Sequence, residues 1–196
     1  MVPVDDIAGV VLAGGESRRM GRDKALLLRD GVPFVVLIAD ALRAVFPEVI
    51  LSANGGAYRS TGLRQVPDLH PGAGPLAGIH AAMGHVRRGH VFVLGCDTPL
   101  VTPDLIRAVC SAAEPGRISV CKDGSGLQPL AGVYPCPAAG RLDAYLGSGG
   151  RSVAGFLEAE GFLTVDVRSF GDLLRNVNTP GDVQSLNGRG GARTPR

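Results

Sequence analysis

A glycine pair followed by a run of cations is the segment of this chain best suited to chemistry. The segment Leu12 to Lys24 has the sequence LAGGESRRMGRDK and follows a short apolar run. Gly14 and Gly15 allow the backbone to approach a ligand closely, and successive amides in such a turn can form a nest for an anion. Arg18 and Lys24 are among the cations that would neutralise a polyphosphate there. The pattern predicts a phosphate-binding loop, and a solvated basic loop is the plainer alternative.

Two common nucleotide-binding motifs do not fit this segment. The dinucleotide fingerprint needs GxGxxG and an acidic residue at the end of the second strand, where this chain has Asn54. The phosphate loop GxxxxGK[ST] is absent as well. Lys24 and Lys122 are the only lysines, and all other basic residues are arginines. A lysine at position 24 therefore indicates that a compact point charge is needed there.

An aspartate after a strongly apolar run is a candidate metal ligand. Asp97 directly follows the run His90 to Cys96, HVFVLGC. An aspartate at the carboxyl end of a central strand can hold Mg²⁺ against phosphate oxygens, although such residues also cap turns. Asp68 is a second candidate polar contact. It precedes the segment Pro71 to Gly78, PGAGPLAG, which could lie flat against a base or ribose or could form an ordinary helix entry.

Two asparagines near the C-terminus could bind a polar ligand. Asn176 and Asn178 stand at alternate positions in the run NVNTP, and alternate residues of an extended chain point to the same side. Turn and cap chemistry is the alternative. The four histidines show no metal spacing such as HExxH, and no Ser-His-Asp set is visible. We therefore expect the histidines to be surface or packing residues.

Alternating strand and helix patterns separate these residues. Apolar runs predict strands at 7–12, 49–53, 63–66, 90–96, 118–122, 128–134 and 162–167. Periodic patterns and cap residues predict helices at 34–46, 76–88, from 103, at 138–146, at 152–159 and from 180. This alternation predicts a three-layer α/β/α domain with a mostly parallel sheet. We expect one domain over residues 1–186 and a disordered tail over residues 187–196.

Composition excludes several classes of protein. The 196 residues are 45% hydrophobic and 19% charged, as in globular proteins, and the net charge of +2 argues against nucleic acid or a membrane as the main partner. No apolar stretch reaches the roughly 18 residues of a membrane span, and no signal peptide is visible. The four cysteines lack CxxC spacing. We therefore expect reduced thiols in a cytoplasmic protein.

Five motifs resemble those of the molybdenum cofactor guanylyltransferase (MobA) family of nucleotidyltransferases, in the family's order. They are LAGGxSxRMGxDK at 12–24, GPLAG at 74–78, CDTP at 96–99, QPLAGVY at 128–134 and NVNTP at 176–180. The first motif is typical of the nucleotidyltransferase superfamily, and GPLAG and NVNTP narrow the likeness to its molybdopterin branch. The resemblance covers Ile7 to about Leu186, and residues 57–65 show no motif.

The resemblance implies a Rossmann-like nucleotidyltransferase fold and the transfer of GMP from GTP to molybdenum-molybdopterin, with release of pyrophosphate. Arg18 and Lys24 would offset phosphate charge, and Asp97 would hold the cofactor Mg²⁺, so these three are the expected catalytic residues. Asn176 and Asn178 would lie on the molybdopterin side. The expected nucleotide-binding residues are Leu12, Ala13, Gly14, Gly15, Lys24, Asn54, Asp68, Gly78 and Asp97.

The implied partners are GTP, molybdenum-molybdopterin, and molybdopterin-carrying and molybdoenzyme proteins. Two other kinds of function stay open. One is a sister transferase that uses CTP or acts on a sugar phosphate, and the other is a non-catalytic nucleotide-binding or cofactor-delivery protein. The chain has LAGG at 12–15 and PLAG at 75–78, where guanylyl members of the family carry them and cytidylyl members differ. The resemblance therefore favours GTP.

Overall fold

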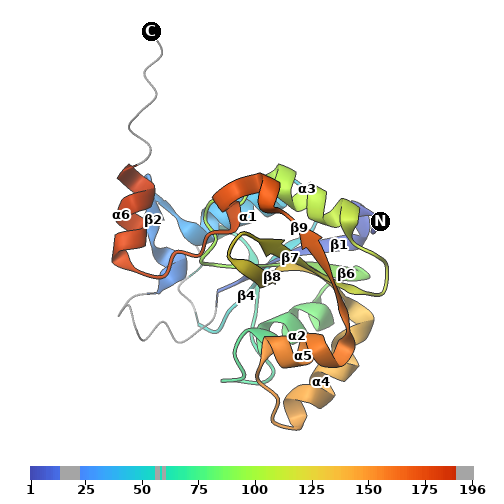
Figure 1. Ribbon diagram of the computed structural model, residues 1–196. Coiled ribbons are helices and arrows are strands. Elements are labelled where there is room, and N and C mark those ends of the chain that lie inside the picture. The colour runs from blue at the N-terminus through green and yellow to red at the C-terminus, as the bar shows by residue number, and fades with distance from the viewer. Residues whose placement is uncertain (14–22, 56–57, 59–60, 189–196) are drawn as a thin grey trace.

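The apolar runs form the strands of one seven-stranded sheet in the computed structural model (Figure 1). The structure describes residues 1–13, 23–55, 58 and 61–188. The strands of the sheet are β1 (Ile7–Leu12), β4 (Val49–Ser52), β5 (Arg64–Val66), β6 (His90–Gly95), β7 (Ile118–Asp123), β8 (Gly126–Pro135) and β9 (Phe162–Asp166). A separate small sheet pairs β2 (Leu28–Arg29) with β3 (Val32–Pro33).

The prediction of a mostly parallel sheet is confirmed. The strand order is β5-β4-β1-β6-β8-β7-β9, and neighbouring strands are parallel except where β8 pairs with β6 and β7. From β1 the chain adds β4 and β5 on one side and then β6 on the other. The strand order therefore reverses beside β1, and open α/β sheets bind ligands at the carboxyl ends of the strands at such a point.

Helices cover both faces of the sheet and make the three predicted layers (Figure 1). One face carries α1 (Phe34–Arg43) and α3 (Pro103–Ala112), and the other carries α2 (Pro75–His85), α4 (Ala139–Gly147) and α5 (Val153–Glu160). The last helix, α6 (Pro180–Gly188), packs against β2 away from the main sheet. Short 3₁₀ turns are η1 (Val4–Asp6), η2 (Lys24–Leu26), η4 (Cys136–Ala138) and η5 (Arg168–Leu174).

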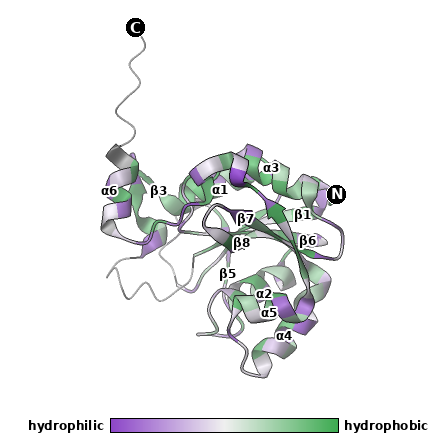
Figure 2. Cartoon of the chain, in the orientation of Figure 1, coloured by the Kyte–Doolittle hydropathy of each residue, from purple (hydrophilic) through white to green (hydrophobic). Residues whose placement is uncertain are grey.

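The central strand β1 illustrates why these strands are apolar throughout. Ile7 and Val11 pack with α1 and α3, whereas Val10 and Leu12 pack with α2 on the opposite face. Alternate residues of a strand face opposite sides, so a strand that is covered on both faces needs apolar residues at every position. Figure 2 shows hydrophobic residues along the central strands and on the helices that cover them.

Element ends differ from the predicted ones by a few residues. The first long helix ends at Arg43 rather than Phe46. Phe46 lies in the turn after the helix, and its side chain is buried there, so the apolar pattern continues past the helix end. The second ends at His85 rather than Arg88. The last helix reaches Gly188, two residues past the expected domain end, and residues 189–196 of the expected tail lie outside the described residues. Within the described part of the chain, no helix has the length and apolar character to span a membrane.

Candidate active site

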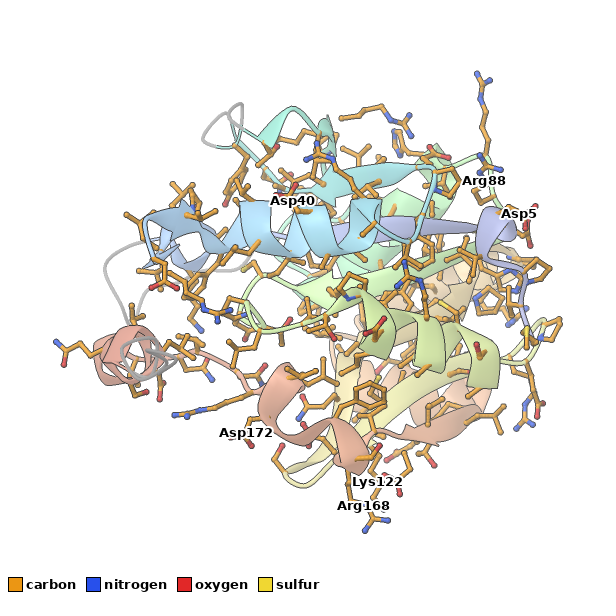
Figure 3. All side chains as sticks on the ribbon, turned by 90° about the horizontal axis from the view of Figure 1, so that it is seen from above. Asp5, Asp40, Arg88, Lys122, Arg168 and Asp172 are labelled. Atoms are coloured by element: carbon orange, nitrogen blue, oxygen red, sulfur yellow. The ribbon has the colours of Figure 1, made fainter. Side chains whose placement is uncertain are left out.

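The two ends of the sheet carry different kinds of residue. Asp5 and Arg88 lie just before β1 and β6, and Arg88 donates a hydrogen bond to the Asp5 carbonyl at 2.8 Å. Figure 3 labels both at one end of the molecule, with α6 at the other end. The amino ends of the parallel strands are therefore joined by surface contacts. The residues with predicted chemistry follow the carboxyl ends of the strands instead.

Backbone hydrogen bonds continue the sheet past the end of β1. The amide of Ala13 donates to the Ser52 carbonyl at 2.9 Å, and the amide of Cys96 donates to the Leu12 carbonyl at 3.0 Å. The side chains of Leu12 and Ala13 are buried. The Ala13 amide and the Leu12 carbonyl are thus already paired within the sheet, and the predicted nucleotide contacts of these two residues stay predictions. The predicted residues Gly14, Gly15 and Arg18 lie outside the described residues.

A cation and a carboxylate are brought together by the C-terminal segment. Lys24 Nζ donates a hydrogen bond to Asn178 Oδ1 at 2.7 Å, across 154 positions of sequence. The neighbouring amide of Val177 donates to the carbonyl of Asp97 at 2.8 Å. Two adjacent residues thus join the loop that holds Lys24 to the loop after β6. The positive charge of Lys24 acts on the Asp97 carboxyl as a result.

The environment of Asp97 fits a divalent cation of the Mg²⁺ type. Burial raises the pKa of Asp97 above its ordinary value, and the charge of Lys24 opposes that rise. A Cβ at Gly95 would lie 2.8 Å from Asp97 Oδ1, so a glycine at this position leaves room for the carboxylate. No side chain in the described ranges donates a hydrogen bond to this carboxylate. Mg²⁺ commonly binds one or two carboxylates together with substrate phosphates, which matches a single free carboxylate here.

Two residues that sequence analysis did not single out hold Lys24 in place. Asp23 Oδ1 accepts a hydrogen bond from the Ala25 amide at 3.0 Å and so caps η2, which begins at Lys24. The buried hydroxyl of Tyr58 donates to the other oxygen of Asp23. Burial and the adjacent Asp23 both raise the pKa of Tyr58 well above its ordinary range, so the hydroxyl keeps its proton and remains a donor. Asp23 belongs to the first motif and could have been found there, whereas Tyr58 lies in the stretch without a motif.

Asn54 and Asp68 form a locked polar pair at the ends of β4 and β5. Asn54 Nδ2 donates to Asp68 Oδ2 at 3.0 Å, and the Asp68 amide donates to Asn54 Oδ1 at 3.0 Å. Ser52 Oγ donates to Asp68 Oδ1 at 3.3 Å. The two predicted nucleotide contacts are therefore side by side, and Ser52 supports them from the strand. Ser52 could not be identified from the sequence, because a serine at the end of a strand belongs to no motif that would indicate a function.

Gly78 has a packing role in the structure. It lies in α2 where that helix crosses the sheet, and a Cβ there would be 2.6 Å from Ser52 Oγ and 3.0 Å from a methyl of Leu12. The glycine therefore permits close approach of helix and sheet, directly behind Asn54 and Asp68. Its predicted contact with the nucleotide stays a prediction.

The NVNTP segment has the alternation that its sequence predicts. Asn176 and Asn178 are exposed, and Val177 between them is fully buried. Asn178 lies against Lys24, whereas Asn176 makes no side-chain hydrogen bond within the described part of the chain. The molybdopterin contacts predicted for both residues stay predictions, but Asn178 is placed next to the predicted phosphate cation.

Solved structures share the fold of this chain. The molybdopterin-guanine dinucleotide biosynthesis protein A of Archaeoglobus fulgidus superposes with a TM-score of 0.78 at 24% identity, covering 93% of this chain and 97% of that one. The 4-diphosphocytidyl-2C-methyl-D-erythritol synthase of Anaerococcus prevotii gives a TM-score of 0.74 at 12% identity, covering 95% and 96%. At these identities the likeness concerns the fold alone. The expected Rossmann-like nucleotidyltransferase fold is confirmed.

Sequence comparison identifies the family. Residues 9–160 match the MobA-like NTP transferase domain. A protein of Pelotomaculum thermopropionicum named "probable molybdenum cofactor guanylyltransferase" is 38% identical over 184 residues, 89% of each chain. The molybdenum cofactor guanylyltransferase of Yersinia pestis is 30% identical over 181 residues, 90% of this chain and 93% of that one. The chain belongs to the MobA-like NTP transferase family, as its motifs predict.

Proposed function

We propose that this protein transfers GMP from GTP to molybdenum-molybdopterin, forming the guanine dinucleotide cofactor and pyrophosphate. The observation that carries the proposal is the meeting of Lys24, Asn178 and the Asp97 loop where the strand order reverses. Relatives that are 30–38% identical over most of the chain are named for this activity. The four cysteines are free thiols, which fits a reducing, cytoplasmic location.

The reaction asks the protein mainly for positioning and charge. A terminal phosphate oxygen of molybdopterin attacks the α-phosphorus of GTP, a new P–O bond forms, and the bond to the β-phosphate oxygen breaks as pyrophosphate leaves. The attacking phosphate is already ionised near neutral pH, so no general base is needed. Catalysis then depends on holding the two phosphates in line and on neutralising the charge of the departing group.

Each residue of the site has a part in this scheme. Lys24 would neutralise phosphate charge, and Asp23 and Tyr58 fix the backbone from which it projects. Asn178 accepts a hydrogen bond from Lys24, so it would stand at the junction between the phosphates and the molybdopterin side. Asp97 would hold Mg²⁺, which supplies electrostatic stabilisation of phosphate oxygens when bound.

The nucleotide would contact the same edge of the sheet at the ends of β4 and β5. The Asn54–Asp68 pair presents polar atoms that are already oriented by mutual hydrogen bonds. The sequence continues from β1 with small residues at positions 13–15, which would leave room for a purine. A site built to hydrogen-bond one base edge rejects a base that lacks it, because buried polar groups would be left unpaired.

A nucleotide panel tests the proposal. The purified protein is incubated with molybdopterin, Mg²⁺ and each of the four ribonucleoside triphosphates in turn, and products are identified by mass spectrometry. We expect the GMP adduct and pyrophosphate from GTP, with a preference over CTP of at least about 10²-fold in kcat/KM. Equal use of CTP, or a preference for it, would contradict the guanylyl assignment. Nucleotide binding without any product would indicate a cofactor-delivery protein instead.

A further inference from the structure

The structure brings two histidines and an aspartate together on the face that carries α2 and α4 (Figure 1). His70 comes from the loop after Asp68, His80 from α2 and Asp143 from α4. Their ligand atoms all lie within 4.8 Å of one another. Because 73 positions separate His70 from Asp143, no local spacing in the sequence could have indicated this cluster. The expectation that the histidines are surface or packing residues did not include such a cluster.

The distances within the cluster are close to those of a metal site. His70 Nε2 lies 2.7 Å from Asp143 Oδ1, and His80 Nε2 lies 3.7 Å from the same oxygen. Tetrahedral bonds of the length found for Zn²⁺ place neighbouring ligand atoms about 3.3 Å apart. The first of these distances would lengthen and the second would shorten on binding. The Asp143 side chain is 57% exposed, so movements of about 1 Å meet little packing resistance.

The charges around the cluster leave a place for a cation. Asp143 is faced by His70 and His80, and no arginine or lysine among the described residues forms an ion pair with it. His80 is largely buried, and Nε2 is the ring nitrogen that lies 3.7 Å from Asp143 Oδ1. Neutral imidazole nitrogens bind metals of this class.

We propose that His70, His80 and Asp143 bind a divalent transition-metal ion of the Zn²⁺ class, at a site separate from Asp97. Two imidazoles and one carboxylate suit such ions, whereas Mg²⁺ prefers oxygen ligands alone. The remaining position would be filled by water. The metal would link the loop that follows Asp68 to α2 and α4. Because this loop begins at Asp68, the link would also stabilise the position of the Asn54–Asp68 pair.

Zinc binding to the tag-free, metal-stripped protein tests this inference. We expect one Zn²⁺ per chain by titration calorimetry, and a rise in melting temperature of roughly 5–10 °C at 100-fold excess over Kd. Co²⁺ should bind the same site with visible absorption bands, and excess Mg²⁺ should not displace either ion. Loss of one ligand should weaken Zn²⁺ binding by at least about 100-fold. Loss of a hydrogen bond that only orients a metal ligand already weakens metal binding by about 10–100-fold.

The variants separate this site from other histidines and from the active site. His70→Ala and Asp143→Asn change exposed or half-exposed side chains, and His80→Ala removes the buried ligand. His85→Ala is the matched control, because His85 lies on the same helix and its side chain hydrogen-bonds, among the described residues, to the Ala81 carbonyl alone. Asp97→Asn should bind Zn²⁺ normally. The inference is overturned if the wild type binds no Zn²⁺, or if folded His70→Ala and Asp143→Asn bind it as tightly as the wild type.

Discussion

The role proposed for Asp97 requires a charge in a place where charge is costly. Its pKa is raised because burial disfavours the carboxylate, and Lys24 recovers only part of that cost. The proposed role as an Mg²⁺ ligand requires the ionised form, so function and stability make opposite demands on this residue. Active sites commonly contain such conflicts, and they can be measured by changing one atom of the side chain.

We expect Asp97→Asn to lose roughly 10²-fold or more in turnover without loss of stability. The raised pKa means that the folded protein keeps this proton to a higher pH than the unfolded chain does. Protonation of Asp97 therefore stabilises the folded state below the ordinary carboxyl pKa, and this stabilisation is lost as the pH rises through the raised pKa. At neutral pH the variant should therefore melt at the same or a higher temperature. Turnover assays and thermal melts measure both quantities.

The same shift predicts a pH profile for the wild type. At Mg²⁺ concentrations well below saturation, turnover should fall on acidification through the raised pKa of metal-free Asp97, because the proton and the metal compete for the carboxylate. The fall should begin at a higher pH than an ordinary aspartate would give. Turnover in Asp97→Asn equal to that of the wild type would remove this residue from the mechanism.

Lys24 should matter to the reaction more than to the fold. Lys24→Ala removes the proposed phosphate cation, and we expect kcat/KM to fall roughly 10²-fold or more while the melting temperature changes little. Lys122→Ala is the matched control, because Lys122 is the other lysine of the chain and is exposed on β7 opposite Asp166 of β9. Figure 3 labels it near Arg168. A large drop in melting temperature with normal turnover per folded molecule would make Lys24 structural.

At the scale of elements, the contact of α2 with β1 and β4 supports the nucleotide side of the site. This helix approaches the sheet closely because residue 78 lacks a side chain, and it packs directly against Ser52.

The C-terminal element is fixed in a different way. Asp182 accepts from the Thr179 amide at 2.9 Å and Thr179 Oγ1 accepts from the Asp182 amide at 3.1 Å, so a capping box starts α6 just after Asn178.

Two alanine substitutions in α2 test the close approach. Gly78→Ala should lower the free energy of unfolding by about 1–3 kcal/mol, because the new methyl would overlap Ser52 Oγ and press on Leu12. Gly84→Ala in the same helix meets no atom within 4 Å and should raise it by about 0.5–1 kcal/mol through helix propensity. Chemical denaturation measures both changes. Equal effects of the two substitutions would show that helix and sheet can separate freely.

At the scale of the whole molecule, the C-terminal segment returns to complete the site. Val177 and Leu186 pack with Phe34 at the start of α1 in a small apolar cluster apart from the two main cores. The same segment carries the amide that binds the Asp97 carbonyl and the side chain that binds Lys24. Burial of Val177 therefore couples the packing of the C-terminus to the geometry of the site.

We expect Val177→Ala to reduce both stability and activity. The loss of two buried methyl groups should cost about 1–3 kcal/mol, and the shifted segment should lower kcat/KM of the folded protein. Val120→Ala on β7 is the control, because Val120 is equally buried but belongs to the core between the sheet and α2. It should lose similar stability and keep its activity per folded molecule. If both variants kept full activity, the C-terminal segment would have no part in the site.

The sequence alone determined the layers, most strands and helices, and the family. The elements and the motifs are local properties of the sequence. A strand buried on two faces must be continuously apolar, as in Ile7 to Leu12, and the five motifs are contiguous runs. Only the tertiary structure decided which side chains meet. Lys24 contacts Asn178 across 154 positions, Tyr58 supports Asp23 from a stretch without a motif, and His70 of the loop after Asp68 meets Asp143 of α4. Such contacts depend on the order of strands and the packing of helices, which no local pattern encodes.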